Sequence, residues 1–254
     1  MRDYLKIKNI STTYQAENGE TPALDNVSFD VAKGEIISIV GPSGCGKSTL
    51  LSVIAGLIKP TKGEIFLDGK KINGINSDVG YMLQRDNLLT WRTIYKNIIL
   101  GLEIQNKLTE ENKKYAEFLM KTYGLYDFKD KYPSQLSGGM RQRAALIRTL
   151  VTKPAVLLLD EAFSALDYQT RLAVTDDVYK ILKKEKKTTL IVTHDIPESI
   201  SMSDRVIVLS NRPAHVKSIH KIDFGSSRLP VSVRNDEKFS EYFNIIWKEL
   251  DIHV

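Results

Sequence analysis

A glycine-rich octapeptide carries the residue types that bind phosphate groups. It is followed by Thr49, and it reads Gly41-Pro42-Ser43-Gly44-Cys45-Gly46-Lys47-Ser48. This run matches the phosphate-loop pattern at every fixed position. The glycines allow a turn whose backbone N–H groups point at phosphate oxygens. The Lys47 ammonium suits the β- and γ-phosphates of a nucleotide, and the Ser48 hydroxyl suits Mg²⁺. The sequence therefore predicts a site for ATP and Mg²⁺.

The segments on either side of this loop fit the same role. Ile36–Val40 is apolar and rich in β-branched residues, as in a strand buried on both faces. Thr49–Leu57 is expected to be a helix, and a helix N-terminus attracts anions. The alternative, a glycine-rich turn without a ligand, does not account for this context. Cys45 falls on a variable position of the loop, where we expect a small filler residue and not a redox switch.

Two carboxylates follow a second apolar run, Ala155–Leu159. Parallel sheets place ligand chemistry at the carboxyl ends of their strands. Asp160 is suited to holding Mg²⁺ through its waters, and Glu161 is suited to polarising an attacking water as a general base. The alternative is a pair of acidic residues in an ordinary loop, which the phosphate loop in the same chain makes the weaker reading.

The rest of the chain supplies the scaffold for these residues. Short alternating segments dominate the first third, with turns predicted at Asn18-Gly19, Lys33-Gly34 and Asp68-Gly69. Residues 88–150 instead show helical periodicity. After Lys153-Pro154, buried strands alternate with helical stretches, which predicts a parallel α/β sheet. We expect one nucleotide-binding domain over residues 1–254. Its core and β subdomain would comprise residues 1–84 and 154–210, its helical lobe residues 85–153, and its C-terminal extension residues 211–254.

Composition excludes several classes of protein. The 254 residues carry a formal net charge of +5, but the basic residues are spread along the chain, so we do not expect nucleic-acid binding. The single cysteine allows no disulfide within the chain. The longest apolar runs fall far short of the ~20 residues that a spanning helix needs, so we do not expect the chain to cross a membrane alone.

A second glycine motif narrows the family. Leu136-Ser137-Gly138-Gly139-Met140 can begin a helix that runs to about Leu150, with the serine hydroxyl and free N–H groups forming another anion site. With Arg141-Gln142-Arg143 after it, this motif resembles the signature of the ATP-binding cassette family. The resemblance implies a P-loop NTPase (RecA-like) fold with an antiparallel β subdomain and an inserted helical lobe. It also implies a head-to-tail dimer in which each signature closes over the partner's γ-phosphate.

Other positions match the family one by one. Tyr14 lies where an aromatic residue stacks on adenine, although an ordinary strand-face tyrosine is the alternative. Gln84 follows a strand-like run, Val79–Leu83, and matches the glutamine that joins Mg²⁺ to the helical lobe. Ser164–Asp167 matches a loop that crosses the dimer interface. His194 matches the histidine that senses the γ-phosphate. Ala162 departs from the family, which usually has proline there.

The segment Gln84–Thr93 is similar to that of the nitrate, sulfonate and taurine importers, with Thr90 in place of a proline. The resemblance implies an ATP-hydrolysing subunit on the cytoplasmic face of a membrane. It would dock transmembrane permease subunits and serve an extracytoplasmic solute-binding protein. We expect Leu88, Leu89 and Trp91 to form an exposed apolar docking patch within residues 85–93, although a core tryptophan of the helical lobe is the alternative for Trp91.

Three alternatives remain open at this point. They are a soluble ABC ATPase that acts on DNA or ribosomes, a regulatory module that holds ATP without turnover, and the motor of an exporter. Glu161 and His194 together argue against the second. The transported solute is chosen by other subunits, so the sequence does not identify it.

Overall fold

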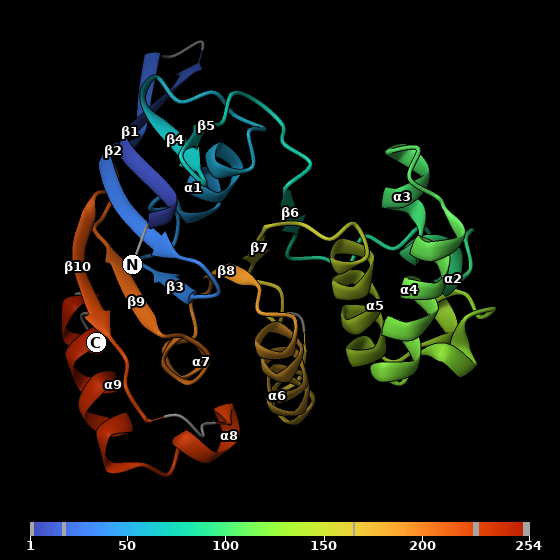
Figure 1. Ribbon diagram of the computed structural model, residues 1–254. Helices are drawn as coiled ribbons and strands as arrows, with labels where there is room; N and C mark the ends of the chain where they lie inside the picture. The colour runs from blue at the N-terminus through green and yellow to red at the C-terminus, as the bar shows by residue number, and fades with distance from the viewer. Residues whose placement is uncertain (1–2, 17–18, 165, 226–228, 251–254) are drawn as a thin grey trace.

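The computed structural model describes residues 3–16, 19–164, 166–225 and 229–250, and it contains two sheets with helices around them (Figure 1). Within these ranges the smaller sheet is antiparallel. Its strand order is β2 (Gly19–Ala32), β1 (Asp3–Ala16), β4 (Lys62–Leu67) and β5 (Lys70–Lys71). The predicted turns at Lys33-Gly34 and Asp68-Gly69 are confirmed. Of the predicted turn Asn18-Gly19, the first residue lies outside the described ranges.

The larger sheet positions the chemistry. Within the described residues its strand order is β10 (Val216–Lys221), β9 (Arg205–Leu209), β3 (Ile36–Val40), β8 (Thr188–Val192), β7 (Val156–Asp160) and β6 (Val79–Met82). All neighbouring pairs are parallel except β10 with β9. Every residue of β3, β7 and β8 is buried, which explains their apolar runs. Because β3, β8 and β7 run parallel, their carboxyl ends meet at one edge of the sheet, and each strand leads into a predicted site residue.

The helix after the phosphate loop differs slightly from the predicted range of residues 49–57. Helix α1 spans Lys47–Ile54 and therefore begins two residues earlier. It ends earlier because Gly56 adopts a φ of 75°, a left-handed conformation that commonly closes a helix. The N-terminus of α1 thus starts at the lysine of the loop itself.

Helical structure fills the stretch between β6 and β7, and Figure 1 shows it gathered on one side of the larger sheet. Its members are α2 (Ile94–Ile98), α3 (Leu100–Ile104), α4 (Glu110–Thr122) and α5 (Gly138–Leu150), with short 3₁₀ turns at Tyr126–Phe128 and Pro133–Gln135. This agrees with the helical periodicity of residues 88–150.

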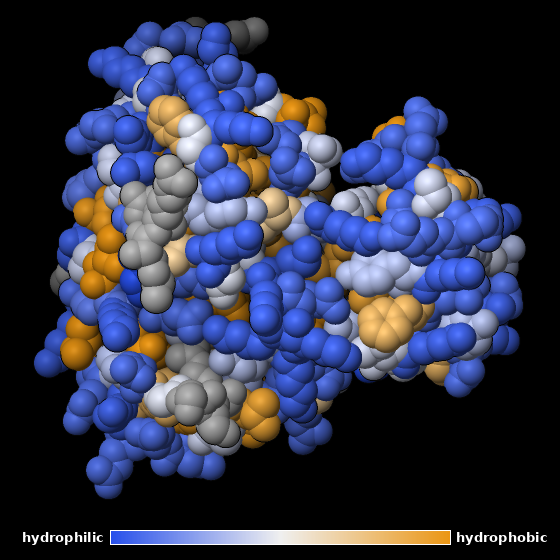
Figure 2. Space-filling model, in the orientation of Figure 1, coloured by the Kyte–Doolittle hydropathy of each residue, from blue (hydrophilic) through white to orange (hydrophobic). Residues whose placement is uncertain are grey.

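The remaining helices belong to the second half of the chain. They are α6 (Tyr168–Lys184), α7 (Ile196–Met202), α8 (Pro230–Val233) and α9 (Glu237–Glu249). α9 buries Ile246 in a core with Val40, Ile200 and Val208. None of the helices in the described ranges is long and apolar enough to cross a bilayer, and the face shown in Figure 2 is mainly hydrophilic.

Candidate active site

The phosphate loop leaves β3 and closes around the side chain of Lys47. Gly44 and Gly46 have φ values of 73° and 127°, which other residues rarely adopt. The buried Lys47 ammonium donates hydrogen bonds to the carbonyl oxygens of Gly41 and Pro42, at 2.8 and 2.9 Å. The predicted loop is therefore formed, and its cation is held at the centre of the turn.

Ser43 and Cys45 of the same loop have opposite environments. Ser43 is exposed, whereas Cys45 is buried in the apolar core beneath the loop. Burial raises the pKa of the Cys45 thiol, which keeps it in its neutral form. The backbone N–H of Cys45 donates to the carbonyl of Pro42 at 3.2 Å within the loop, while its side chain packs as a small apolar group.

Tyr14 lies beside the start of α1. Its hydroxyl is 3.1 Å from Oγ1 of Thr49, the residue after the phosphate loop. The ring is partly exposed on β1. It is a strand residue, as the simpler interpretation holds, and the contact also places it at the edge of the loop, where a nucleotide base could stack on it.

Ser48 and Asp160 meet at the carboxyl edge of the sheet. The Ser48 hydroxyl donates to Oδ1 of Asp160 at 3.1 Å, and the Tyr81 hydroxyl donates to Oδ2 at 3.0 Å. Burial raises the pKa of Asp160, while the two hydrogen bonds oppose this effect. A hydroxyl and a carboxylate oxygen at one point fit Mg²⁺, which prefers oxygen ligands and would bring positive charge to bound phosphates.

Glu161 is the meeting point of three predicted residues. Its Oε2 lies 3.2 Å from Nδ1 of His194 and 3.3 Å from Nε2 of Gln84. The Glu161 backbone is left-handed, with a φ of 45°, and its N–H donates to the carbonyl of Val192 at 2.8 Å. Such strain costs about 1–3 kcal/mol and persists where surrounding structure enforces it, often at functional sites.

The loop that carries His194 is held by its neighbours. Asp195 donates its N–H to Oγ1 of Thr193 at 3.0 Å. Its Oδ1 accepts the N–H of Glu198 at 2.9 Å and so caps α7. The His194 side chain itself is half-exposed, so it faces Glu161 on one side and solvent on the other.

Ser137 caps the helix of the second glycine motif, as predicted. Its hydroxyl accepts the N–H of Met140 at 3.3 Å, and α5 runs to Leu150. Within the described residues, no hydrogen bond or ion pair joins Ser137, Gly138 or Gly139 to the phosphate loop. The structure therefore brings together the loop, the carboxylates, Gln84 and His194, but not the second anion site.

Tyr81 is a site residue that sequence reasoning missed. It lies on β6, and Asp160 ends the neighbouring strand β7. The two residues are 79 positions apart, and only the strand order brings them together. Tyr81 sits in a strand segment that we expected to precede Gln84, so no local signal linked it to the metal site.

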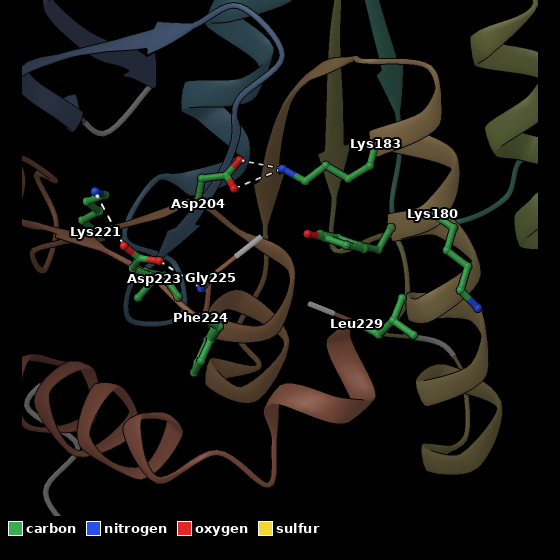
Figure 3. A pocket seen from close by; sticks show the side chains of 10 residues that line it. Lys180, Lys183, Asp204, Lys221, Asp223, Phe224, Gly225 and Leu229 are labelled. Atoms are coloured by element: carbon green, nitrogen blue, oxygen red, sulfur yellow. Dashed lines mark hydrogen bonds and ion pairs between the residues drawn. The ribbon is translucent and has the colours of Figure 1, made fainter. Parts of the chain in front are cut away.

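The cavity in Figure 3 lies elsewhere, and none of the predicted site residues lines it. It measures about 850 Å³ and is bounded by α6, by Asp204 before β9, by the end of β10 with the residues that follow it, and by Leu229 before α8. Lys183 is paired with both carboxylate oxygens of Asp204 at 3.1 Å, and Lys180 points away from the cavity. Nζ of Lys221 lies 3.9 Å from Oδ2 of Asp223. We assign no role in nucleotide chemistry to this cavity.

Comparison with known proteins decides the family. A family model described as ABC transporter matches residues 24–164. The chain belongs to this family. It is 47% identical over 249 residues to the uncharacterized ABC transporter ATP-binding protein YtlC of Bacillus subtilis, covering 98% of this chain and 96% of that protein. It is 36% identical over 251 residues to the taurine import ATP-binding protein TauB of Roseobacter denitrificans, covering 96% of this chain and 94% of that protein.

Solved ABC cassettes have the same fold. The dimeric structure of MJ0796, a bacterial ABC transporter cassette, aligns with a TM-score of 0.74 and 34% identity, covering 87% of this chain and all of that one. A post-hydrolysis state of MJ0796 bound to ADP and Pi aligns with a TM-score of 0.73 at 32% identity. The chain is an ABC-type ATPase, which confirms the predicted fold class and enzyme class.

Proposed function

We propose that this ABC ATPase is the motor subunit of a membrane importer for a small solute of the nitrate, sulfonate or taurine kind. The observation that carries the proposal is an exposed tryptophan close to Gln84 in the sequence. Trp91 is 73% exposed and lies seven residues after Gln84. Aromatic side chains, tryptophan among them, are enriched in protein–protein interfaces. Similarity to taurine import proteins supports the same direction.

The loop that carries Trp91 is ordered by a buried side chain. The amide nitrogen of Asn97 donates to the carbonyls of Leu89, Arg92 and Thr93, each at 3.0 Å. Its amide oxygen accepts the N–H of Leu89 at 2.7 Å. The hydrogen bonds of Asn97 thus hold the loop in place, and the loop exposes Trp91 to solvent.

The exposed patch is smaller than the sequence suggested. We expected Leu88, Leu89 and Trp91 to lie together on the surface. Leu88 is instead buried in the core of the helical segment, and Leu89 is only partly exposed. Trp91 therefore acts as a single aromatic anchor, the kind of residue that often dominates binding energy at an interface.

Contacts connect this loop to the helix of the second glycine motif. Arg141, in the first turn of α5, donates to Oδ2 of Asp86 at 3.0 Å. Arg148 donates to the carbonyls of Asp86 and Asn87 at 2.6 and 2.7 Å. A partner that binds Trp91 would accordingly move both the Gln84 segment and α5.

The proposed chemistry follows from the arrangement around Glu161. Lys47 and the N–H groups of the phosphate loop would bind the phosphates of ATP, and Tyr14 would stack on the base. Ser48, Asp160 and Gln84 would hold Mg²⁺. Glu161 would take a proton from the attacking water. The oxygen of that water would bond to the γ-phosphorus while the bond between the γ-phosphorus and ADP breaks.

The second anion site gives the proposal its dimer. Ser137, Gly138 and Gly139 would bind the γ-phosphate held by a second copy, and the loop Ser164–Asp167, of which Ala165 lies outside the described residues, would cross the interface. The dimeric state of MJ0796 supports this. His194 would contact the γ-phosphate. Residues 85–153 would form the lobe that docks permease subunits at the cytoplasmic face of the membrane.

Trp91→Ala tests the importer proposal, with Trp247→Ala as the matched control. Each variant would be tagged in the source cell and purified from detergent-solubilised membranes. We expect wild type and Trp247→Ala to bring down a polytopic membrane protein in stoichiometric amount, and Trp91→Ala to lose it while keeping basal ATPase activity. Purification of the wild type alone would instead indicate a soluble ABC ATPase. ATPase activity of the complex that does not respond to any extracytoplasmic binding protein would indicate an exporter.

A further inference from the structure

One arginine joins the two loops that flank the catalytic glutamate. Arg171 lies in the first turn of α6, the helix that Asp167 caps. Its Nη2 donates to the carbonyl oxygen of Leu166 at 3.0 Å, and its Nη1 lies 3.2 Å from Oδ2 of Asp195. Leu166 belongs to the loop expected at the dimer interface, and Asp195 directly follows His194. One planar guanidinium therefore fixes the separation of these loops.

The carboxylate of Asp195 transmits this constraint to the histidine. Its Oδ2 contacts Arg171, while its Oδ1 caps α7 by accepting the N–H of Glu198 at 2.9 Å. Because the Asp195 N–H is also bonded to Thr193, the backbone on both sides of His194 is held. A shift of Arg171 therefore shifts the peptide that carries the imidazole, which lies 3.2 Å from Glu161.

The contact is more enclosed than an ordinary surface ion pair. The side chains of Arg171 and Asp195 are 22% and 21% exposed. Glu198 is buried beside them, and α8 packs against both α6 and α7. The Nε of Arg171 is buried without a hydrogen-bond partner among the described residues, as is the Nε of Arg234 just after α8. A buried nitrogen without a hydrogen-bond partner calls for an explanation. Since Arg171 carries such a nitrogen and still contacts both loops, its side chain is suited to holding the two loops in position.

We infer that Arg171 is a positioning residue for His194, which carries the position of the interface loop to the histidine. This inference rests on the role proposed above for His194. When a second copy presses on the loop around Leu166, the guanidinium passes the displacement to Asp195 and so to the imidazole. Dimer closure and the placement of His194 against the γ-phosphate are thereby coupled through a single side chain.

A double-mutant cycle tests the inference. The variants are Arg171→Met, His194→Ala and the two together, measured by single-turnover ATP hydrolysis with enzyme in excess. We expect Arg171→Met to lower the rate roughly 10- to 100-fold, the scale expected of a small misplacement. The KM for ATP should stay within about twofold, since binding is unaffected. In the His194→Ala background, Arg171→Met should cause no further loss.

Arg205→Met is the matched control. Arg205 is also 22% exposed, pairs with Glu35 at 2.6 Å and donates to the carbonyl of Asp30. It is the first residue of β9 and therefore lies at the amino ends of the strands, away from the site at their carboxyl ends. Arg205→Met should lower the unfolding midpoint without changing the rate. Asp195→Asn keeps a capping side chain but loses the charge that pairs with Arg171. It should lower the rate of hydrolysis in the same way, and it takes the place of Arg171→Met if Arg171→Met folds poorly.

The possible results distinguish the inference on Arg171 from the role proposed for His194. Equal losses from Arg171→Met in both backgrounds would overturn the inference, because Arg171 would then act independently of His194. An unchanged rate in Arg171→Met and Asp195→Asn would also overturn it. An unchanged rate in His194→Ala would remove the proposed role of His194, and the inference with it.

Discussion

The carboxylate of Glu161 lies 3.2 Å from the imidazole Nδ1 of His194. The two residues come from neighbouring strands, since Glu161 follows β7 and His194 lies two positions after β8. The amide of Gln84 reaches the same carboxylate oxygen at 3.3 Å. The glutamate is thus oriented from two directions, as a general base must be if it is to face one water molecule.

Glu161→Gln should still bind ATP but lose turnover. The amide preserves the size of the side chain and removes its ability to accept a proton, and loss of a general base typically costs ~10²–10⁴ in rate. Steady-state phosphate release measures the rate, and calorimetric titration measures the affinity for ATP. Glu103→Gln, which removes an ion pair with Arg92, is the control and should keep normal turnover. Turnover within about tenfold of wild type would remove Glu161 from this role.

Lys47→Ala should weaken nucleotide binding itself. The variant removes the cation and leaves the carbonyls of Gly41 and Pro42 without their donor. Hydrogen bonds to charged groups contribute about 1.5–3 kcal/mol, which corresponds to a loss of affinity of roughly 10- to 100-fold. Calorimetric titration with ATP measures this, with the exposed Lys62→Ala as control. The same affinity in Lys47→Ala and wild type would contradict the assignment.

Much of the site was predictable because its signals are local. The run Ile36–Val40 is buried as its composition indicates, the phosphate loop follows it directly, and Ser137 caps α5. Each of these features depends on residues within one turn or one strand. Motif spacing alone therefore placed Ser137 correctly at the start of α5, whereas Lys47, which we expected in the loop, is the first residue of α1.

Features that depend on strand order or on irregular loops were not predictable. Tyr81 reaches Asp160 only because β6 is placed next to β7, and Arg171 reaches Asp195 only because α6 packs against α7, which Asp195 caps. The loop around Leu88 has no regular periodicity, so apolar character alone could not separate its buried leucine from its exposed tryptophan.

Glu198 should make a contribution to the stability of the protein that is lost as pH rises. Burial raises the pKa of Glu198 to about 8, aided by the negative charge of Asp195 and opposed by Arg171 and Arg234. An unfolded glutamate titrates near ~4.3, so between these values the folded state holds a proton that the unfolded state has lost. The contribution is full below the unfolded pKa and disappears as pH rises through the folded one.

Glu198→Gln should therefore flatten the pH dependence of unfolding. The uncharged amide cannot ionise, so the free energy of unfolding should decline less between pH 6 and pH 9 than it does in wild type, by about the contribution of one proton. Urea unfolding at several pH values measures it. Glu237→Gln, an exposed position in α9, should keep the wild-type slope. Parallel pH profiles for Glu198→Gln and wild type would show that Glu198 is already charged in the folded protein.

ATP should drive dimerisation, most visibly in the Glu161→Gln background where the nucleotide persists. Ser137 presents a capped helix start that makes no hydrogen bond or ion pair with the phosphate loop in the described part of its own chain, so we expect a phosphate bound there to be held by another copy. ATP held between two chains stabilises the dimer by mass action. Light scattering with Mg-ATP should give twice the monomer mass, and Ser137→Arg should return it to one. Ser240→Arg, on the exposed side of α9, adds the same bulk and charge elsewhere and should stay dimeric. A Glu161→Gln protein that remains monomeric at saturating ATP and high protein concentration would show that the active site is complete within one chain.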